Sequence, residues 1–367
     1  MTVDDRSGGS AGPGFESSDS EEPLLVLDDL KTHFRTERGL VRAVDGVSLT
    51  LRRGESIGIV GESGSGKTVL SRSIMGLLPD SAVTSGSVRF AGQEILDLPA
   101  KQRRHLWGAE MSMVFQNPLN SLNPLMKVGK QIAEPLRLHM GMNKAAARET
   151  AVALLRSVHI PEPEARLSQF PHELSGGMRQ RIMIAMALAC GPTLLFADEP
   201  TTALDVTVQA QILEVIEEQR RDRNMSVVLV THDLGVVAGF TDQIAVMYGG
   251  KLVERAPTRT LFAEMRMPYT YSLLKSIPRL ADASHTRLST IPGRPPDLVS
   301  PPKGCNFAPR CPYAREKCHE EEPTLEPTAD PNHLFACWYP VGSPEFRERE
   351  AELGERGPSL DSFEAVS

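Results

Sequence analysis

The chain has 367 residues, 40% of them hydrophobic, with a formal net charge of −7 and an isoelectric point near 5.8. This length suits one large domain with insertions and an extension, and the acidic balance argues against a nucleic-acid-binding surface. No apolar run approaches the roughly 20 residues that a membrane span needs, and the N-terminus lacks the cationic-then-apolar pattern of a signal peptide. We therefore expect a cytoplasmic protein that attaches to a membrane only through partner subunits.

The first part of the chain changes abruptly from tail to folded domain. Residues 1–22 are rich in Gly, Ser and acidic residues, which predicts a disordered tail. A β-rich segment follows and contains the short apolar run Ser56–Val60, which is typical of a buried strand. A Gly-rich loop then leads into a helix predicted from Thr68 to Leu78. Strand, loop and helix thus occur in the order that a phosphate-binding loop requires.

The Gly-rich loop has the composition of a nucleotide site. It reads GESGSGKT and consists of Gly61, Glu62, Ser63, Gly64, Ser65, Gly66, Lys67 and Thr68. Its glycines let the backbone curl around an anion with the amide groups pointing inward. Lys67 adds a positive charge for the β- and γ-phosphates, and Thr68 offers a hydroxyl to Mg²⁺. We therefore expect ATP and Mg²⁺ to bind here.

Three further apolar runs each end in a polar residue. The runs and the residues that follow them are Met111–Phe115 with Gln116, Leu194–Asp198 with Glu199, and Ser226–Thr231 with His232. Their length and apolar character predict buried strands, and strand–helix alternation indicates a parallel α/β core.

The polar residues at these strand ends suit phosphoryl transfer, which needs mainly positioning and charge stabilisation. Asp198 is placed to hold the Mg²⁺ shell, and Glu199 to polarise the attacking water. Gln116 could complete the metal shell and sense the γ-phosphate, and His232 could contact that phosphate. With Lys67, they are the candidate catalytic and metal-binding residues.

A helical insert is expected between the first and second of these strands, at about residues 117–190. It contains an Ala-rich helix predicted at 144–158, and it ends in the sequence LSGGM. There Ser175, Gly176 and Gly177 open a helix with bare backbone amides, which makes a second anion site.

The C-terminal part of the chain is rich in proline and cysteine. Residues 278–340 contain four of the five cysteines within 33 residues, namely Cys305, Cys311, Cys318 and Cys337. Disulfides are not expected in a cytosolic chain, and the spacing lacks the paired knuckles of structural zinc sites. Four thiolates could instead hold an iron–sulfur cluster, with zinc as the alternative. Residues 341–367 are polar and acidic, and we expect a mobile tail.

These motifs together resemble the nucleotide-binding subunits of ABC transporters, over roughly residues 24–275. By this resemblance GESGSGKT is the Walker A loop, LSGGM the signature and LLFADE the Walker B strand. Gln116 is then the Q-loop residue, residues 203–205 the D-loop and His232 the switch histidine. Phe34 lies where these proteins place an aromatic ring against adenine; the alternative is that it belongs to the core of the β subdomain.

Several segments resemble one branch of that superfamily, the oligopeptide and dipeptide permease ATPases. The segments are residues 115–134, 178–189, 198–213 and 267–274. Met267 stands where that branch has His, but the following Pro-Tyr-Thr is intact. CNFAPRCPYAREKC at 305–318 is similar to the C-terminal extension of these ATPases, where a [4Fe–4S] cluster is assigned. The resemblance therefore favours a cluster at the four cysteines, with zinc as runner-up.

The resemblance implies an α/β fold: a P-loop NTPase core with a RecA-like parallel sheet, an antiparallel β subdomain, an α-helical subdomain and the cysteine-rich extension. Residues 23–277 would form the nucleotide-binding domain. It implies an ATPase that powers peptide import when two subunits close head to tail, the signature of one over the ATP of the other.

The implied partners are a second and different ABC ATPase subunit, two transmembrane permease subunits and an extracytoplasmic substrate-binding protein, at the cytoplasmic face of the membrane. Residues 117–128 would line the permease-docking groove. The alternative is a soluble ABC ATPase that acts on nucleic acid or ribosomes. The cargo, and whether both ATP sites hydrolyse, are left open by the sequence.

Overall fold

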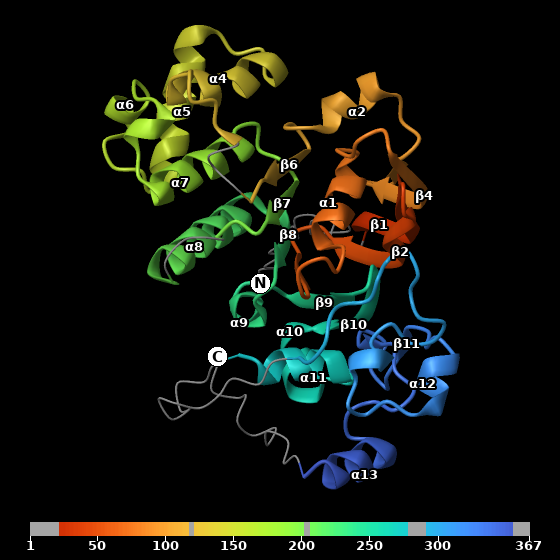
Figure 1. The fold of residues 1–367 in the computed structure, drawn as a ribbon. Coiled ribbons are helices and arrows are strands. Elements are labelled where there is room, and N and C mark those ends of the chain that lie inside the picture. The colour runs from red at the N-terminus through yellow and green to blue at the C-terminus, as the bar shows by residue number, and fades with distance from the viewer. Residues whose placement is uncertain (1–21, 117–120, 202–205, 278–290, 355–367) are drawn as a thin grey trace, which may run out of the picture.

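The computed structural model describes residues 22–116, 121–201, 206–277 and 291–354. Figure 1 shows two sheets, a group of helices on one side of them and a C-terminal extension on the other. No helix in these ranges is long and apolar enough to cross a bilayer.

The larger sheet forms the centre of the fold. Its eight strands are, in spatial order, β11 (Glu326–Pro327), β12 (Leu334–Phe335), β10 (Lys251–Pro257), β9 (Gln243–Tyr248), β3 (Ser56–Val60), β8 (Ser226–Thr231), β7 (Leu194–Asp198) and β6 (Met111–Val114). The five strands from β9 to β6 run parallel. All residues of β3, β6, β7 and β8 are buried, as expected of parallel strands covered on both faces. The predicted strands are confirmed to within one residue.

The smaller sheet is antiparallel and carries the first strands of the chain. Its order is β2 (Gly39–Arg52), β1 (Pro23–Thr36), β4 (Ala82–Phe90) and β5 (Gln93–Glu94). Helix α1 (Lys67–Met75) packs against β1, β2 and β7. It ends three residues before the predicted Leu78 because Gly76 adopts a left-handed conformation with φ of 64° and caps it.

The remaining helices fall into two groups. The helical unit contains α4 (Val128–His139), α5 (Lys144–Ser157), α6 (Pro163–Arg166) and α7 (Gly176–Ala187). The second group lies outside the helical unit and consists of α2 (Ala100–Leu106), α8 (Val206–Arg223), α9 (Leu234–Ala238), α10 (Thr258–Glu264) and α11 (Pro268–Lys275). In the helical unit, α4 packs on α5 and α7, and its buried residues belong to the same hydrophobic cluster as β7 and β8. The insert therefore shares its core with the central sheet.

The C-terminal extension is attached to that sheet. Strand β12 pairs with β10 through Leu334 and Phe335, which extends the sheet by two strands. Phe307 and Tyr313 are buried in the main hydrophobic cluster. The helix α12 (Glu316–Glu320) and the short turn Ala308–Arg310 complete this region. A segment poor in apolar residues is thus stabilised by packing on the core.

The expected mobile tail is corrected for part of its length. Residues Pro344–Glu352 form α13, and Phe346 is buried with 2% exposure. Its ring stacks on Tyr313 at 4.0 Å and meets Tyr271 edge-on at 5.7 Å. One apolar side chain in a polar segment is sufficient here because the two tyrosines supply a complementary aromatic surface.

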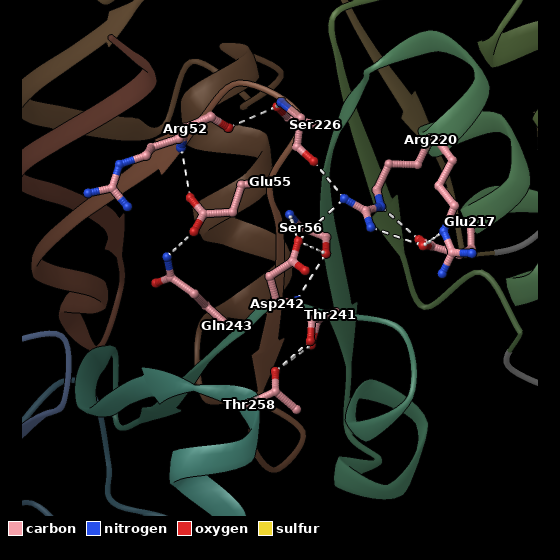
Figure 2. Close-up of polar contacts among 12 residues, drawn as sticks. Arg52, Glu55, Ser56, Glu217, Arg220, Ser226, Thr241, Asp242, Gln243 and Thr258 are labelled. Atoms are coloured by element: carbon pink, nitrogen blue, oxygen red, sulfur yellow. Dashed lines mark hydrogen bonds and ion pairs between the residues drawn. The ribbon is translucent and has the colours of Figure 1, made fainter. Parts of the chain in front are cut away.

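A polar network joins the starts of the parallel strands (Figure 2). The Asp242 carboxylate accepts hydrogen bonds from the Ser56 amide and hydroxyl at 2.8 and 2.7 Å, and from Arg220 at 3.3 Å. Arg220 also pairs with Glu217 at 2.7 Å and donates to the Gly54 carbonyl at 2.6 Å. These contacts fix the amino ends of the strands, at the edge of the sheet opposite the candidate site.

Candidate nucleotide site

The predicted site residues meet at the carboxyl edge of the parallel strands. Val60 pairs with Thr231, Asp198 with Val230 and Val114 with Ala197. Residues that follow these strands are therefore neighbours in space although they lie far apart in the chain. Crevices outside the carboxyl ends of such strands are where open α/β sheets bind ligands.

The phosphate loop can form only with glycine at two positions. Gly61 has φ of 153°, and a Cβ there would lie 2.3 Å from the Met247 carbonyl oxygen. Gly66 has φ of 105°, and its Cβ would lie 2.3 Å from the Ala43 carbonyl oxygen. Both contacts are to backbone, so a larger residue would displace the loop. Gly66 also precedes the first turn of α1, which has no side-chain cap, and uncapped amide groups at a helix N-terminus can bind an anion.

Lys67 lies inside the loop and is 4% exposed. Its Nζ donates to the carbonyl oxygens of Gly61 at 2.7 Å and Glu62 at 2.9 Å. Burial lowers the pKa of this ammonium group, and the carboxylates of Glu199, Asp198 and Glu62 act in the opposite direction. An anionic phosphate would add a further favourable charge beside this lysine.

Asp198 and Thr68, the two residues predicted to bind Mg²⁺, are in direct contact. Thr68 Oγ1 donates to Asp198 Oδ1 at 2.9 Å, and Asp198 is 1% exposed. Burial raises the pKa of Asp198, although the Thr68 hydrogen bond and Arg72 oppose the shift. Its second oxygen, Oδ2, is buried with no hydrogen-bond partner in the part of the chain that the structure describes. Hard oxygen ligands with spare acceptor capacity fit Mg²⁺.

Glu199 is held between two of the other predicted residues. Its Oε2 accepts a hydrogen bond from Gln116 Nε2 at 2.7 Å, and its Oε1 lies 3.4 Å from His232 Nδ1. The Glu199 backbone has φ of 46°, which turns the side chain away from the line of β7. The Glu199 side chain is 16% exposed and His232 61% exposed. The carboxylate is thus oriented at the rim of the site, as a water-positioning group must be.

The signature residues lie apart from the phosphate loop. Ser175 caps α7, and its hydroxyl accepts from the Met178 amide at 3.3 Å. Ser175 and Gly176 are exposed, and α7 belongs to the helical unit rather than to the loop beside α1 (Figure 1). Gly177 lies within the first turn of α7. The predicted second anion site therefore lies at an exposed helix N-terminus.

Phe34 is half-buried in β1, opposite Val41, and belongs to neither hydrophobic cluster. Its contact with adenine therefore stays a prediction. The predicted D-loop at 203–205 lies outside the described residues, as do residues 117–120 of the predicted docking segment.

One contact between the extension and the phosphate loop was not predicted from the sequence. Arg310 donates to both carboxylate oxygens of Glu62, at 2.6 and 3.0 Å. The Glu62 amide donates to the Tyr269 hydroxyl at 2.9 Å. Two signals in the sequence pointed to these residues: Arg310 precedes Cys311, and Tyr269 lies in a segment that resembles the peptide-importer ATPases. Their spacing in the sequence did not indicate a contact with Glu62.

The four cysteines of the extension line one small pocket together with Phe307 and Tyr313. Burial raises the pKa of Cys305 to about 11 and that of Cys311 to about 12, and it also raises the pKa of Cys337. Neighbouring thiols add to each of these shifts. Within the described ranges, no set of three or more His, Cys, Asp or Glu side chains is placed to hold a metal ion. Thiolate sulfurs are the donors that soft metal centres prefer. His333 does not line this pocket and pairs with Glu254 at 2.9 Å.

Fold and site geometry define an ATPase of the ABC type, and comparison with known proteins agrees. Residues 44–202 match the ABC transporter family, and residues 253–318 match the oligopeptide/dipeptide transporter C-terminal region. The oligopeptide transport ATP-binding protein OppD of Salmonella typhimurium is 50% identical over 87% of this chain and 94% of its own length. The dipeptide transport ATP-binding protein DppD of Bacillus subtilis is 50% identical over 86% and 95%. The chain belongs to the family of ABC transporter ATP-binding proteins that includes OppD and DppD.

Solved structures place the same fold in a dimer. The ATP-binding cassette MJ0796, in a dimeric post-hydrolysis state bound to ADP and Pi, superimposes with a TM-score of 0.59 at 27% identity. The match covers 64% of this chain and 99% of that cassette.

Proposed function

We propose that this chain is the ATP-hydrolysing subunit of an importer for dipeptides or oligopeptides. The observation that carries the proposal is the match of residues 253–318 to the C-terminal region of oligopeptide and dipeptide transporters, together with 50% identity to OppD. A soluble ABC ATPase acting on nucleic acid has no such support, and the net charge of −7 disfavours it.

The proposed chemistry assigns one task to each residue at the carboxyl edge of the sheet. Backbone amides of the loop and Lys67 bind the phosphates of ATP, and Phe34 stacks on adenine. Glu199 orients a water molecule and accepts its proton, so that the water oxygen bonds to the γ-phosphorus while the bond to the bridging oxygen of ADP breaks. His232 and Gln116 hold the Glu199 carboxylate and contact the γ-phosphate. Mg²⁺, held by Thr68 and Asp198 with Gln116 beside them, would neutralise charge on the phosphates.

Closure of two subunits supplies the mechanical step. The exposed N-terminus of α7, with Ser175, Gly176 and Gly177, would bind the ATP held by the facing subunit. A dimer that closes only with ATP has a differential affinity between two states, which is what a conformational switch requires. The proposed partner is a second, related ATPase subunit, and two permease subunits and an extracytoplasmic binding protein complete the importer. The ATPase would then sit at the cytoplasmic face of the membrane as a peripheral subunit.

For the extension we propose a [4Fe–4S] cluster held by Cys305, Cys311, Cys318 and Cys337, with zinc as the runner-up. Support comes from the four cysteines that line one pocket, of which Cys318 is buried and the other three are partly buried. Burial raises the pKa of Cys305, Cys311 and Cys337, so a bound cluster would have to displace a proton from each of these thiols. A cluster bound there would cross-link the turn at 308–310, α12 and the segment after β12. Iron and acid-labile sulfide should be near-stoichiometric after anaerobic purification, and zinc without iron would replace the cluster in this proposal.

Peptide uptake tests the main proposal. The chain is reconstituted in liposomes with the partner ATPase, the permease subunits and the binding protein, and uptake of labelled dialanine and trialanine is followed. We expect peptide uptake only when ATP is supplied on the side of the liposome membrane to which this chain is bound. Absence of uptake, together with salt-dependent binding of this chain to a DNA or RNA duplex in a gel shift, would favour the soluble alternative.

A further inference from the structure

A partly buried ion pair connects the cysteine-rich extension to the phosphate loop. Arg310 Nη1 and Nη2 donate to the two oxygens of Glu62 at 2.6 and 3.0 Å. The Arg310 side chain is only 5% exposed, and that of Glu62 is 27% exposed. Arg310 is itself fixed, because its Nε donates to the Pro292 carbonyl at 2.8 Å and its Nη1 lies 3.2 Å from the Tyr248 hydroxyl. The two residues are 248 positions apart in the chain.

An aromatic cluster supports the same loop residue from the side of α11. The Tyr269 hydroxyl accepts the Glu62 amide hydrogen at 2.9 Å. Its ring lies 4.5 Å from Tyr248 and 5.2 Å from Phe307, centroid to centroid. Phe307, like Arg310, belongs to the extension, and it meets Tyr248 edge-on at 5.2 Å. The extension thus reaches the loop through a direct ion pair and through packed rings.

Glu62 is consequently held at three points. Arg310 binds its carboxylate, Tyr269 its amide, and Lys67 its carbonyl oxygen at 2.9 Å. The third contact matters most, because Lys67 is the residue that must meet the phosphates. The position of the Glu62 backbone therefore sets one of the two anchors of the Lys67 ammonium group.

We propose that Arg310 is a positioning residue for ATP binding: by holding Glu62 it pre-orders the phosphate loop, so that the extension contributes directly to nucleotide affinity. This inference rests on the proposed nucleotide site. The guanidinium acts through Glu62 and touches no phosphate. A bidentate arginine fits this task because its two parallel hydrogen bonds fix the orientation of a carboxylate as well as its position.

The size of the effect follows from the order that Arg310 imposes. Fixing the backbone of one residue changes an equilibrium constant by about fivefold to thirtyfold. If ATP must itself order Glu62 when Arg310 is gone, we expect binding about tenfold weaker. The loss concerns ground state and transition state alike, so KM for ATP should rise while kcat at saturating ATP changes little.

The test compares Arg310→Gln with Arg315→Gln in the full-length chain. Arg315 is an extension arginine that pairs with Glu348 at 2.6 Å and does not contact the loop, so it controls for general disturbance of the extension. The dissociation constant of a fluorescent ATP analogue and the KM and kcat of hydrolysis are measured. We expect a rise of about tenfold in the dissociation constant and KM for Arg310→Gln alone. Equal effects in both variants, or unchanged affinity in folded Arg310→Gln, would overturn the inference.

Three further variants keep the result interpretable. The double variant Glu62→Gln/Arg310→Gln should bind ATP no more weakly than Arg310→Gln alone, because both substitutions remove the same interaction. A further loss of ATP affinity in the double variant would mean that Arg310 does not act through Glu62. Arg310→Lys retains the charge without the bidentate geometry, so its ATP affinity should lie between those of wild type and Arg310→Gln. If Arg310→Gln fails to fold, the comparison of Arg310→Lys with wild type carries the test: weaker binding by Arg310→Lys supports the inference, and equal binding contradicts it. Lys67→Ala separates the two proposals. If it too leaves binding unchanged, the nucleotide site is wrong; if it alone loses binding, only the role of Arg310 is wrong.

Discussion

Replacing Glu199 by glutamine should separate ATP binding from hydrolysis. The substitution keeps the size of the side chain and its ability to accept the Gln116 hydrogen bond of 2.7 Å, but it removes the base. Lys67 with its contacts to Gly61 and Glu62, and Thr68 with Asp198, do not involve this carboxylate directly. ATP affinity should therefore be retained.

The magnitude follows from the role that the geometry assigns to Glu199. Loss of a positioned general base typically slows a reaction by about 10²- to 10⁴-fold. At about 1.4 kcal/mol for each tenfold change, the barrier rises by roughly 3 to 5 kcal/mol. Because product formation would then be slow relative to closure, ATP should hold the dimer closed, and the closed species should accumulate.

The assay is single-turnover hydrolysis of labelled ATP, with size-exclusion chromatography in ATP and Mg²⁺ to detect the dimer. Glu218→Gln is the matched control, because Glu218 also contacts a histidine, His159, at 2.8 Å, but on the exposed side of α8 and away from the site. It should hydrolyse ATP as the wild type does. Turnover of Glu199→Gln at the wild-type rate would refute the assignment of Glu199 as the water-positioning base.

Two further predictions concern how the extension is held. Phe346→Ala should remove about 3 to 5 kcal/mol of packing from a ring that is 2% exposed, so α13 should undock and become sensitive to limited proteolysis while ATP binding is retained; a protease-resistant α13 in this variant would contradict its docking through Phe346. Within the described residues, His333→Ala leaves the fully buried Glu254 carboxylate with the Arg266 and Met267 amides as its hydrogen-bond donors, and the free energy of unfolding, measured by urea denaturation, should fall by about 1 to 3 kcal/mol. His333→Gln restores a donor and should recover part of that loss; equal losses in the two variants would show that packing, not the contact to Glu254, is responsible.

Much of the nucleotide site could be predicted because its residues lie in a few short segments with recognisable local patterns. The loop at 61–68 needs glycine where the backbone meets other carbonyls, and the strands before Gln116, Glu199 and His232 are uniformly apolar. Once parallel pairing is assumed, the residues that follow these strands must converge. The same reasoning placed α5 at 144–157 almost to the residue, since helical periodicity is also a local property.

The phosphate loop, the buried strands and the acidic pair at 198–199 were therefore predictable from short segments, because each depends on the conformation of a few consecutive residues. Tertiary structure alone decided that Arg310 binds Glu62, that β12 lengthens the core sheet, and that Phe346 orders a polar segment as α13. These contacts join residues far apart in the chain. They depend on which surfaces the fold brings together, and local patterns of residue types do not predict such contacts.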